Sequence, residues 1–366
     1  AVGEAVPGPA RVIASSGGIK VIDARGRVHG FMPGNAVSAS VYTAAGPADD
    51  VELNGATYPG RLVFVPSDDG PDRFDVVNVT GIESYLPGVL SRELYSHWHE
   101  SAFRVQAVAA RTFALDRREN ARRAGRHFDL ESTTTDQVYA GSTSLRVAID
   151  AVDATRGMIL ISSDRIAQAY YSSTCGGRPA LPEEIWPPAS GAATPVALAA
   201  PQQSEPTPWR ETLCDLAPLY HWETLRDTDD LNRRLLAWAG SVGRRDITAM
   251  RSITAIEPTE HGASGRPILF ELRGPRGNAA TITAERLRIA SNFQDGGIGQ
   301  LPARARLHSN DLQIEIGRRV TRVTGRGHGH GVGLCQFCAQ AMAVRGDHWR
   351  QMLSAFYPSA EVRRVY

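Results

Sequence analysis

The sequence predicts an α+β protein, and two changes of pattern along the chain lead to this fold class. Short β-rich runs, separated by clusters of Gly, Pro and Asp, fill residues 10 to 79, as in a small antiparallel module. From residue 87 onward, longer stretches carry the apolar spacing of helices and alternate with further strand-like runs. We therefore expect helices and β-rich parts to pack together rather than to alternate in a regular βαβ order.

Residues 1–76 are predicted to form an N-terminal β-rich module, and residues 77–366 a second, larger part. Strands are expected over residues 11–14, 36–42 and 61–65. Helices are expected over residues 87–95, 101–124 and 144–155, with strand-like runs at 158–162 and 167–172. We place Pro87 in the first turn of its helix, because that turn tolerates a residue without a backbone N–H.

Residues 187–208 are predicted to form a surface excursion, because Pro, Ala, Ser and Gln dominate them and offer little to bury. A short helix over residues 231–239 precedes a β-rich middle part at about 245–323. Within that part, strands are expected over residues 268–272 and 280–283. The chain closes with a Gly-rich stretch, 325–333, and with helices over 334–345 and 348–356.

The bulk composition excludes several classes of function. The 366 residues are 42% hydrophobic and 22% charged, which is enough to bury a real core. The formal net charge is +1 and no cluster of basic residues occurs, so nucleic acid is not an expected partner. Lys20 is the only lysine, and arginine is a poor covalent nucleophile, so Schiff-base chemistry is not expected.

The sequence contains no apolar run long enough to span a bilayer. The longest stretch, around residues 105–115, is interrupted by Gln106 and Arg111. The first residues carry neither a basic n-region nor an apolar h-region, so we expect a signal peptide to be absent or already removed.

Glu93 is the first candidate for catalysis. With Leu86, Val89 and Leu90 it falls at helical positions i, i+3, i+4 and i+7, so its carboxylate would share their apolar face. Partial burial raises the pKa of a carboxyl group, and cleavage of a glycosidic bond needs a proton held near neutral pH. The alternative is a purely structural ion pair with a neighbouring arginine.

Gln106 and Arg111 are polar residues in a helix that is otherwise small and apolar. Buried polar side chains need hydrogen-bond partners, and a carboxylate on a neighbouring helix would supply them. We therefore expect both residues to orient Glu93. Alternatively, they bond to nearby backbone groups, and Arg111 or Arg92 forms the structural ion pair.

Glycines occupy every second position from Gly325 to Gly333 and flank Arg326, His328 and His330. Such a density of glycine lets the backbone approach a ligand closely or adopt positive φ. A phosphate loop is not predicted, because the run contains neither Gly-Lys-Ser/Thr nor Gly-x-Gly-x-x-Gly. If the segment is extended, the two imidazoles face the same side, where they would bind substrate, ligate a metal or fill a turn.

The four cysteines leave several interpretations open. Cys175 and Cys214 would form a disulfide at the base of the surface excursion or, with His221, a metal site. Cys335 and Cys338 follow the two histidines above, but their spacing fits no standard zinc finger. We favour a disulfide or free thiols over zinc. Cys175 is also a candidate nucleophile, although no feature indicates a lowered pKa for its thiol.

Five ordered blocks of this sequence resemble the SpoIID/LytB family. They are Val77-Asn78-Val79 with residues 84–93 (SYLPGVLSRE), residues 107–114 (AVAARTFA), 136–141 (DQVYAG), 171–177 (YSSTCGG) and 327–336 (GHGHGVGLCQ). The resemblance spans residues 77 to 346, whereas the N-terminal module and the middle stretch match only in general character. Several blocks in the same order speak against a chance match.

The resemblance implies a peptidoglycan lytic transglycosylase. Such an enzyme cleaves the β-1,4 bond between N-acetylmuramic acid and N-acetylglucosamine on denuded glycan strands and forms 1,6-anhydromuramoyl ends. The catalytic glutamate of the family falls on Glu93, which would act first as acid and then as base, so that no second carboxylate is needed. The implied fold is SpoIID-like, with residues 77–366 as a catalytic region whose helical segment packs with β-rich parts around an extended groove.

The residues then expected to orient the acid or to bind sugar are Gln106, Arg111, Tyr139, His328, His330 and Gln336. No cofactor is required for this reaction, and zinc remains the alternative. The sequence departs from the family pattern at Ser172, where many members carry His, and at Cys175 and Cys338, which replace Ser and Gly. Because some members bind zinc near that His, Ser172 speaks against a homologous metal site.

The implied partners are peptidoglycan glycan strands and another wall hydrolase such as an amidase, and the implied location is extracytoplasmic. The first alternative is a non-catalytic wall-binding protein, because some relatives are described as amidase enhancers. The second is a metal- or thiol-dependent amidase that uses Cys175 or the pair His328 and His330.

Overall fold

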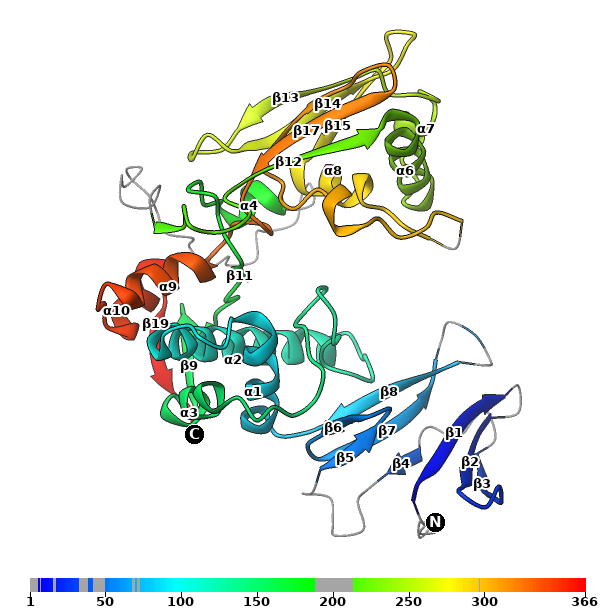
Figure 1. The fold of residues 1–366 in the computed structure, drawn as a ribbon, viewed down its shortest axis with the longest axis vertical. Coiled ribbons are helices and arrows are strands. Elements are labelled where there is room, and N and C mark those ends of the chain that lie inside the picture. Colours follow the sequence, from blue (N-terminus) through cyan, green and yellow to red (C-terminus); the bar gives the residue numbers. More distant parts are fainter. Residues whose placement is uncertain are drawn as a thin grey trace. The chain divides into compact units, whose positions relative to one another are not determined.

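The computed structural model describes residues 6, 8–15, 18–32, 39–41, 50–67, 70, 73–187, 213–295 and 297–366. These residues form helices and several small sheets, which confirms the predicted α+β class (Figure 1). The chain divides into two compact units, Ala1–Arg92 with Arg118–Asp153, and Glu93–Arg117 with Ala154–Tyr366. Among the described helices, none combines the length and the apolar character that a membrane crossing needs. The domain limits proposed from the sequence stay a prediction.

The described strands of the first unit form two antiparallel three-stranded sheets and a hairpin. The first sheet has the order β1 (Ala10–Ser15), β2 (Gly18–Asp23), β3 (Val28–Met32). The second has the order β4 (Ala39–Val41), β7 (Arg61–Pro66), β8 (Phe74–Val79). The hairpin joins β5 (Val51–Leu53) to β6 (Ala56–Tyr58) through Asn54 and Gly55, which both have positive φ, 53° and 80°. An Asn-Gly pair with positive φ at both positions is the preferred two-residue hairpin turn.

The period-two pattern of β7 accounts for the core of these sheets. Leu62 and Phe64 are buried while their neighbours are partly exposed, because successive side chains of a strand point to opposite faces. They pack with Ile19 and Val51. The strands predicted over residues 11–14 and 61–65 are confirmed by β1 and β7. Of the strand predicted over residues 36–42, β4 covers part, and residues 36–38 and 42 lie outside the described residues.

Helix α1 (Ile82–Glu93) begins earlier than the sequence predicts. Two N–H groups of its first turn donate to the carbonyl of Gly81, so the helix is established before Pro87 is reached. The placement of Pro87 in the first turn was therefore wrong, because this residue lies inside the helix and removes one N–H donor there. The predicted apolar stripe is confirmed by three fully buried side chains, Leu86, Val89 and Leu90. The other two predicted helices are α2 (Glu100–Arg123) and α3 (Arg146–Ala154).

Two large hydrophobic cores lie among the described residues of the second unit. The first core joins the N-terminal half of α2 to β9 (Met158–Ser162), α9 (Gln336–Val344) and α10 (Trp349–Phe356). Strand β9 matches its prediction and lies between β10 (Arg165–Ile166) and β19 (Glu361–Arg364). Of the run predicted over residues 167–172, only β11 (Tyr171–Ser172) is a strand, and it pairs in parallel with β18 (Leu334–Cys335). The hydroxyl of Thr112 in α2 accepts from the N–H of Leu160 at 3.0 Å and so ties this helix to β9.

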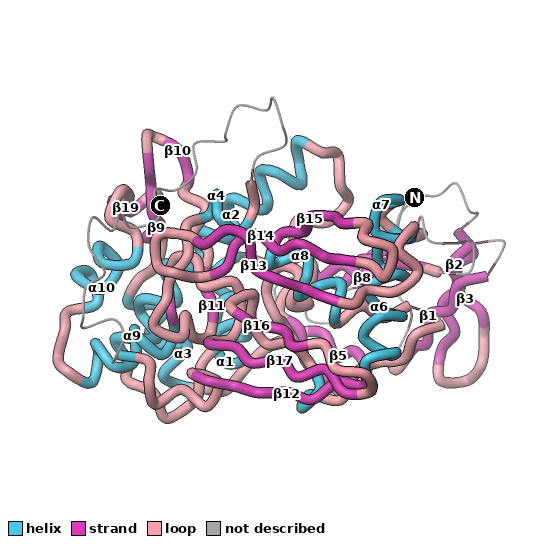
Figure 2. Tube along the Cα trace, turned by 90° about the horizontal axis from the view of Figure 1, so that it is seen from above, coloured by secondary structure: helices cyan, strands magenta, loops and turns pink. Residues whose placement is uncertain are grey.

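The second core lies between two three-stranded sheets and two helices (Figures 1 and 2). One sheet has the order β12 (His221–Asp227), β17 (Val320–Arg326), β16 (Leu312–Glu315). The other has the order β13 (Ala255–His261), β14 (Pro267–Arg273), β15 (Ala279–Thr283). The helices of this core are α6 (Thr228–Ser241) and α8 (Ala284–Ser291). Shorter elements are α4 (Pro182–Ile185), α7 (Arg245–Thr248) and the 3-10 turn Ala303–Ala305.

The excursion predicted at residues 187–208 lies outside the described residues, apart from Pro187. The strands predicted over residues 268–272 and 280–283 are confirmed by β14 and β15. The expected extended groove stays a prediction.

Candidate functional site

Glu93 is the last residue of α1, and its side chain is half-buried. The side-chain N–H of Gln336, the first residue of α9, donates to Oε2 of Glu93 at 3.0 Å. Gln336 itself is 4% exposed, so packing holds its amide in place. The bond fixes the plane of the carboxyl group and thereby the direction of its second oxygen. Glu93, which the sequence predicts to be the acid, and Gln336, which it predicts to bind sugar, are thus in direct contact.

Gln106 does not make the predicted hydrogen bond to Glu93. It is 1% exposed, and neither atom of its amide has a hydrogen-bond partner among the residues that the structure describes. The orienting contact expected from Gln106 therefore comes from Gln336. The periodicity of α2 placed Gln106 correctly in the interior. It could not show that the hydrogen-bond partner of Glu93 is Gln336, which lies 243 residues further along the chain.

Arg111 is fully buried in α2. Its Nη1 donates to the carbonyls of Ala107 and Met158 at 3.4 and 3.1 Å and to the hydroxyl of Thr155 at 3.4 Å. These bonds agree with the alternative prediction that Arg111 donates to nearby backbone groups rather than to Glu93. Neither Arg111 nor Gln106 presents a surface to a sugar in this structure.

An aromatic cluster flanks the pair formed by Glu93 and Gln336. Tyr95 and Trp98 follow α1 with ring centroids 5.3 Å apart, and Phe337 lies 6.1 Å from Tyr95 and 4.9 Å from Trp98. Tyr95 is 52% exposed, whereas Trp98 is buried beneath it. Sequence reasoning missed these residues, although two of them follow the acid by two and five positions. Their rings are tilted or edge-on to one another and offer an apolar surface next to Glu93 and Gln336 in the chain.

Tyr139 lies in the first unit and supports α1. Its hydroxyl donates to Oδ1 of Asn78 at 3.0 Å, and its ring contacts Tyr85 and Tyr58 at centroid distances of 4.7 and 6.0 Å. An added Cβ at Gly88 of α1 would lie 2.8 Å from this ring, so the helix passes directly against it. Burial raises the pKa of Tyr139 above its usual range, which keeps the phenol neutral.

The Gly-rich segment is not an extended strand. Four of its glycines have positive φ, 81°, 98°, 78° and 71° at Gly327, Gly329, Gly331 and Gly333. The ring of His328 contacts His308 at a centroid distance of 5.6 Å, whereas the ring of His330 contacts Trp186 at 5.1 Å and Tyr170 at 5.8 Å. The segment does not meet the condition under which both imidazoles were expected to face the same side, because the positive φ values break the period of two. The expected use of glycine for positive φ is confirmed.

A fully buried arginine, Arg266, holds this segment. Its guanidinium donates to the carbonyl of His330 at 2.7 Å and to those of Arg178 and Cys175 at 3.0 Å. An added Cβ at Gly331 would lie 2.7 Å from Cζ of Arg266, so only glycine lets the backbone come this close. Nothing in the sequence around Arg266 marks it as a central residue.

His330 accepts a hydrogen bond through Nδ1 from the N–H of Val332 at 3.0 Å. Burial lowers the pKa of His330 to about 4. Arg288 and Arg266 act in the same direction, and Glu285 opposes them. At neutral pH the imidazole is therefore uncharged and closes the turn of the Gly-rich segment. His328 is exposed, and its backbone pairs with Thr174.

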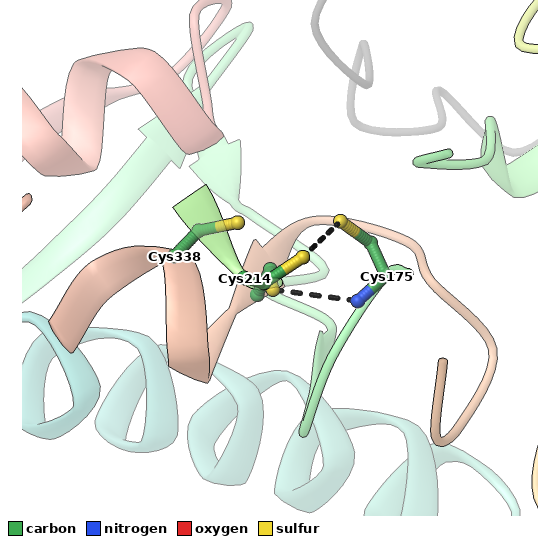
Figure 3. Close-up of side chains that lie close together, drawn as sticks. Cys175, Cys214 and Cys338 are labelled. Carbon is green, nitrogen blue, oxygen red and sulfur yellow. Dashed lines mark hydrogen bonds between the residues drawn. The ribbon is translucent and has the colours of Figure 1, made fainter. Parts of the chain in front are cut away.

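The structure gathers the four cysteines in one place, where sequence reasoning had divided them into two pairs. The sulfur atoms of Cys175, Cys214, Cys335 and Cys338 all lie within 4.8 Å of one another, and all four residues are buried. Figure 3 labels three of these side chains, and Sγ of Cys175 and Cys214 are 3.7 Å apart. All four are free thiols, so the disulfide between Cys175 and Cys214 is not formed.

His221 is not part of this cluster, because it lies exposed on β12, where it pairs with Arg326. Its assignment as a metal candidate was wrong, since closeness in sequence to Cys214 did not bring the two side chains together. Hydrogen bonding with Cys175 lowers the pKa of Cys214, and burial raises the pKa of Cys335. The cluster therefore favours a thiolate at Cys214.

The model of the SpoIID family, which is described as Stage II sporulation protein, matches residues 71–161 of this chain. An uncharacterized protein of Brachyspira hyodysenteriae is 29% identical over 317 residues, which cover 86% of this chain and 74% of the relative. The Stage II sporulation protein D of Bacillus subtilis is 24% identical over 295 residues, which cover 77% of this chain and 74% of the relative.

The amidase enhancer of Bacillus subtilis is 25% identical over 298 residues, which cover 75% of this chain. The match spans only 39% of the amidase enhancer. The matched family segment contains α1 and therefore Glu93.

Replacement of Gly331 by Ala should destabilise the protein more than replacement of Gly277 by Ala. Both glycines have a φ of +78°, but Gly277 has open space where Gly331 meets Arg266. The strained backbone should cost about 1–2 kcal/mol in either variant. The clash at Gly331 should add about 1–3 kcal/mol, measured by urea unfolding. Equal losses in the two variants would contradict the close packing against Arg266.

Acidification should destabilise the wild-type protein more than the variant His330→Asn. The pKa of His330 is about 4 in the folded protein against the usual 6.5. The unfolded chain therefore binds more protons at His330, and stability falls as the pH drops from about 6.5 toward 4. We expect the wild type to lose on the order of 2 kcal/mol more stability than the variant between pH 7.5 and pH 4 in denaturant unfolding, while the loss due to His328 and His308 remains in both. The exposed His97→Asn serves as control and should behave as the wild type.

Proposed function

Because this chain belongs to the SpoIID family through residues 71–161, we propose that it is a cell-wall protein that cleaves peptidoglycan glycan strands as a lytic transglycosylase. Its substrate would be the β-1,4 bond between N-acetylmuramic acid and N-acetylglucosamine, and its site of action would lie outside the cytoplasm. The observation that carries this proposal is the half-buried carboxyl group of Glu93 oriented by Gln336.

The proposed reaction needs one acid that later acts as a base. Glu93, in its protonated form, gives its proton to the oxygen between the two sugars, and the bond from that oxygen to the anomeric carbon of the muramoyl sugar breaks. The 6-hydroxyl of the same muramoyl sugar forms the new bond to that carbon and returns its proton to the carboxylate. No water is consumed, and the enzyme ends in its starting protonation state. Because the hydrogen bond from Gln336 occupies Oε2, the plane in which Oε1 meets the substrate is defined.

The aromatic cluster beside Glu93 supports a sugar substrate. Sugar rings present apolar C–H faces, which stack on exposed aromatic rings, and Tyr95 is 52% exposed. Phe337 follows Gln336 directly in sequence, so the residue that orients the acid and a residue of the apolar platform come from the same turn of α9. A glycan strand lying on Tyr95 would therefore pass close to the carboxyl group.

The second candidate function is a non-catalytic wall-binding protein that enhances an amidase, favoured by the likeness to the amidase enhancer of Bacillus subtilis. An amidase that uses Cys175 as its nucleophile is disfavoured, because Cys175 is 3% exposed and its sulfur lies among three other thiols. An amidase that relies on His328 and His330 is disfavoured because the two imidazoles contact different rings.

Replacement of Glu93 by Gln should abolish cleavage while leaving fold and glycan binding in place. The amide cannot donate a proton to the leaving oxygen, and general acid–base catalysis supplies about a hundredfold or more. Mass spectrometry of denuded glycan after incubation measures the products, with Glu100→Gln, an exposed glutamate of α2, as matched control.

Anhydromuramoyl ends from the wild type, retained by Glu100→Gln and lost in Glu93→Gln, are the expected result. New reducing ends would indicate a hydrolase instead. Absence of products from the wild type, together with stimulation of an added amidase, would establish the second candidate function. Unchanged turnover by Glu93→Gln would refute the assignment of the acid.

Replacement of Tyr95 by Ser should weaken glycan binding, because it removes the exposed ring beside Glu93. Loss of one aromatic contact corresponds to about 0.5–1.5 kcal/mol, so KM should rise roughly twofold to tenfold while kcat changes less. Tyr366→Ser is the matched control, since Tyr366 is exposed to a similar extent, 56% against 52%. Equal affinity of the Tyr95→Ser variant and the wild type would argue against the platform.

A further inference from the structure

The four buried thiols described above have the arrangement of a metal site rather than of a disulfide pair. A disulfide has an S–S distance of about 2.0 Å. In a tetrahedral zinc site the Zn–S bonds of about 2.3 Å place the sulfur atoms about 3.8 Å apart. The sulfur atoms of Cys175 and Cys214 are 3.7 Å apart, and all four lie within 4.8 Å of one another. We propose that Cys175, Cys214, Cys335 and Cys338 bind one zinc ion as a tetrathiolate.

The backbone around the cluster fits this assignment. Cys335 and Cys338 are separated by two residues, as in one half of a four-cysteine zinc site. Cys335 is the N-cap of α9, whose positive end faces the sulfurs that would carry negative charge. The N–H of Cys175 points to Sγ of Cys335 at 3.4 Å, and such a bond stabilises a thiolate (Figure 3).

The charge of the surroundings gives independent support. Four thiolates around one zinc ion leave two negative charges in excess, and a buried group of that charge needs a cation nearby. Arg266 is fully buried, and its Nη2 donates to the carbonyl of Cys175 at 3.0 Å. Its Nε lies 4.0 Å from the carboxylate of Asp311, which is a loose contact for a buried ion pair. A zinc tetrathiolate would supply the remaining countercharge for this guanidinium.

The site joins three parts of the second unit. Cys175 follows β11, Cys214 follows the segment that begins after Pro187, and Cys335 and Cys338 hold the start of α9. Since Gln336 lies between the last two ligands, zinc would anchor the residue that orients Glu93. Four protein ligands leave no open coordination position, so the zinc has a structural role and does not activate water. The proposal is therefore independent of whether the protein cleaves glycan.

The test is the metal content of the full chain, purified without added metal and without a metal-affinity tag. We expect about one zinc per chain by elemental analysis, and in the matched variants Cys214→Ser and Cys338→Ser less than about a tenth of that. Ala339→Ser, which adds a hydroxyl to the same core beside a ligand, should keep the zinc. Removal of zinc from the wild type should lower Tm, and addition of zinc should restore it, because the ion binds the folded state.

Two measurements on the wild type keep the proposal testable if the cysteine variants do not fold. Cobalt in place of zinc should produce the absorption of a tetrahedral thiolate site, and unfolding in the presence of a chelator should expose four reactive thiols. A metal-free protein, a thiol count below four because of a disulfide, or iron in place of zinc would each overturn the assignment. Glu93→Gln should retain the zinc, so a failure of the proposed cleavage reaction would remain distinguishable from a failure of the metal site.

Discussion

The guanidinium of Arg266 is the interaction on which the second unit depends most. It is fully buried and donates to the carbonyls of Cys175 and Arg178 in one segment and to that of His330 in another, about 150 residues later in the sequence. A buried cation is costly unless its donors are satisfied, so these bonds admit few alternative arrangements of the backbone. The glycine at position 331 is a consequence, because no Cβ fits beside this guanidinium. The Gly-rich segment therefore packs closely around Arg266, and this packing determines where the imidazoles of His328 and His330 lie.

The proposed active site combines a carboxyl group at the end of one helix with an amide at the start of another. Glu93 ends α1 and Gln336 begins α9, so each side chain projects from a helix terminus rather than from the middle of a helix. A terminus leaves more room for a bulky polysaccharide than a helix flank does, while the helices themselves hold the two groups rigidly. The aromatic residues Tyr95, Trp98 and Phe337 extend this arrangement on the side of the acid.

Local patterns in the sequence were sufficient for much of the fold and for the half-buried position of Glu93, but not for the surroundings of its carboxyl group. The period of α2 and the apolar stripe of α1 follow from helical spacing, and β9 follows from a continuous apolar run. The start of α1 was misjudged, because two N–H groups of its first turn donate to the carbonyl of Gly81 and the helix reaches Pro87 only after that turn. The partner of Glu93 and the meeting of the four cysteines depend on contacts between distant segments, which no local pattern encodes. The positive φ values that separate His328 from His330 likewise arise from tertiary packing.

The separation of 243 residues between Glu93 and Gln336 has a consequence for the order of folding. Contacts of such long range form late, because the entropy of closing the intervening loop must be overcome before the contact is gained. During synthesis, α1 is complete long before α9 has been made, so the emerging chain carries its carboxyl group without the amide that aligns it. A polypeptide cut short ahead of α9 would remain in that state. The alignment of Glu93 thus depends on a residue that is made 243 positions later, so that the proposed cleavage would have to wait until α9 has formed.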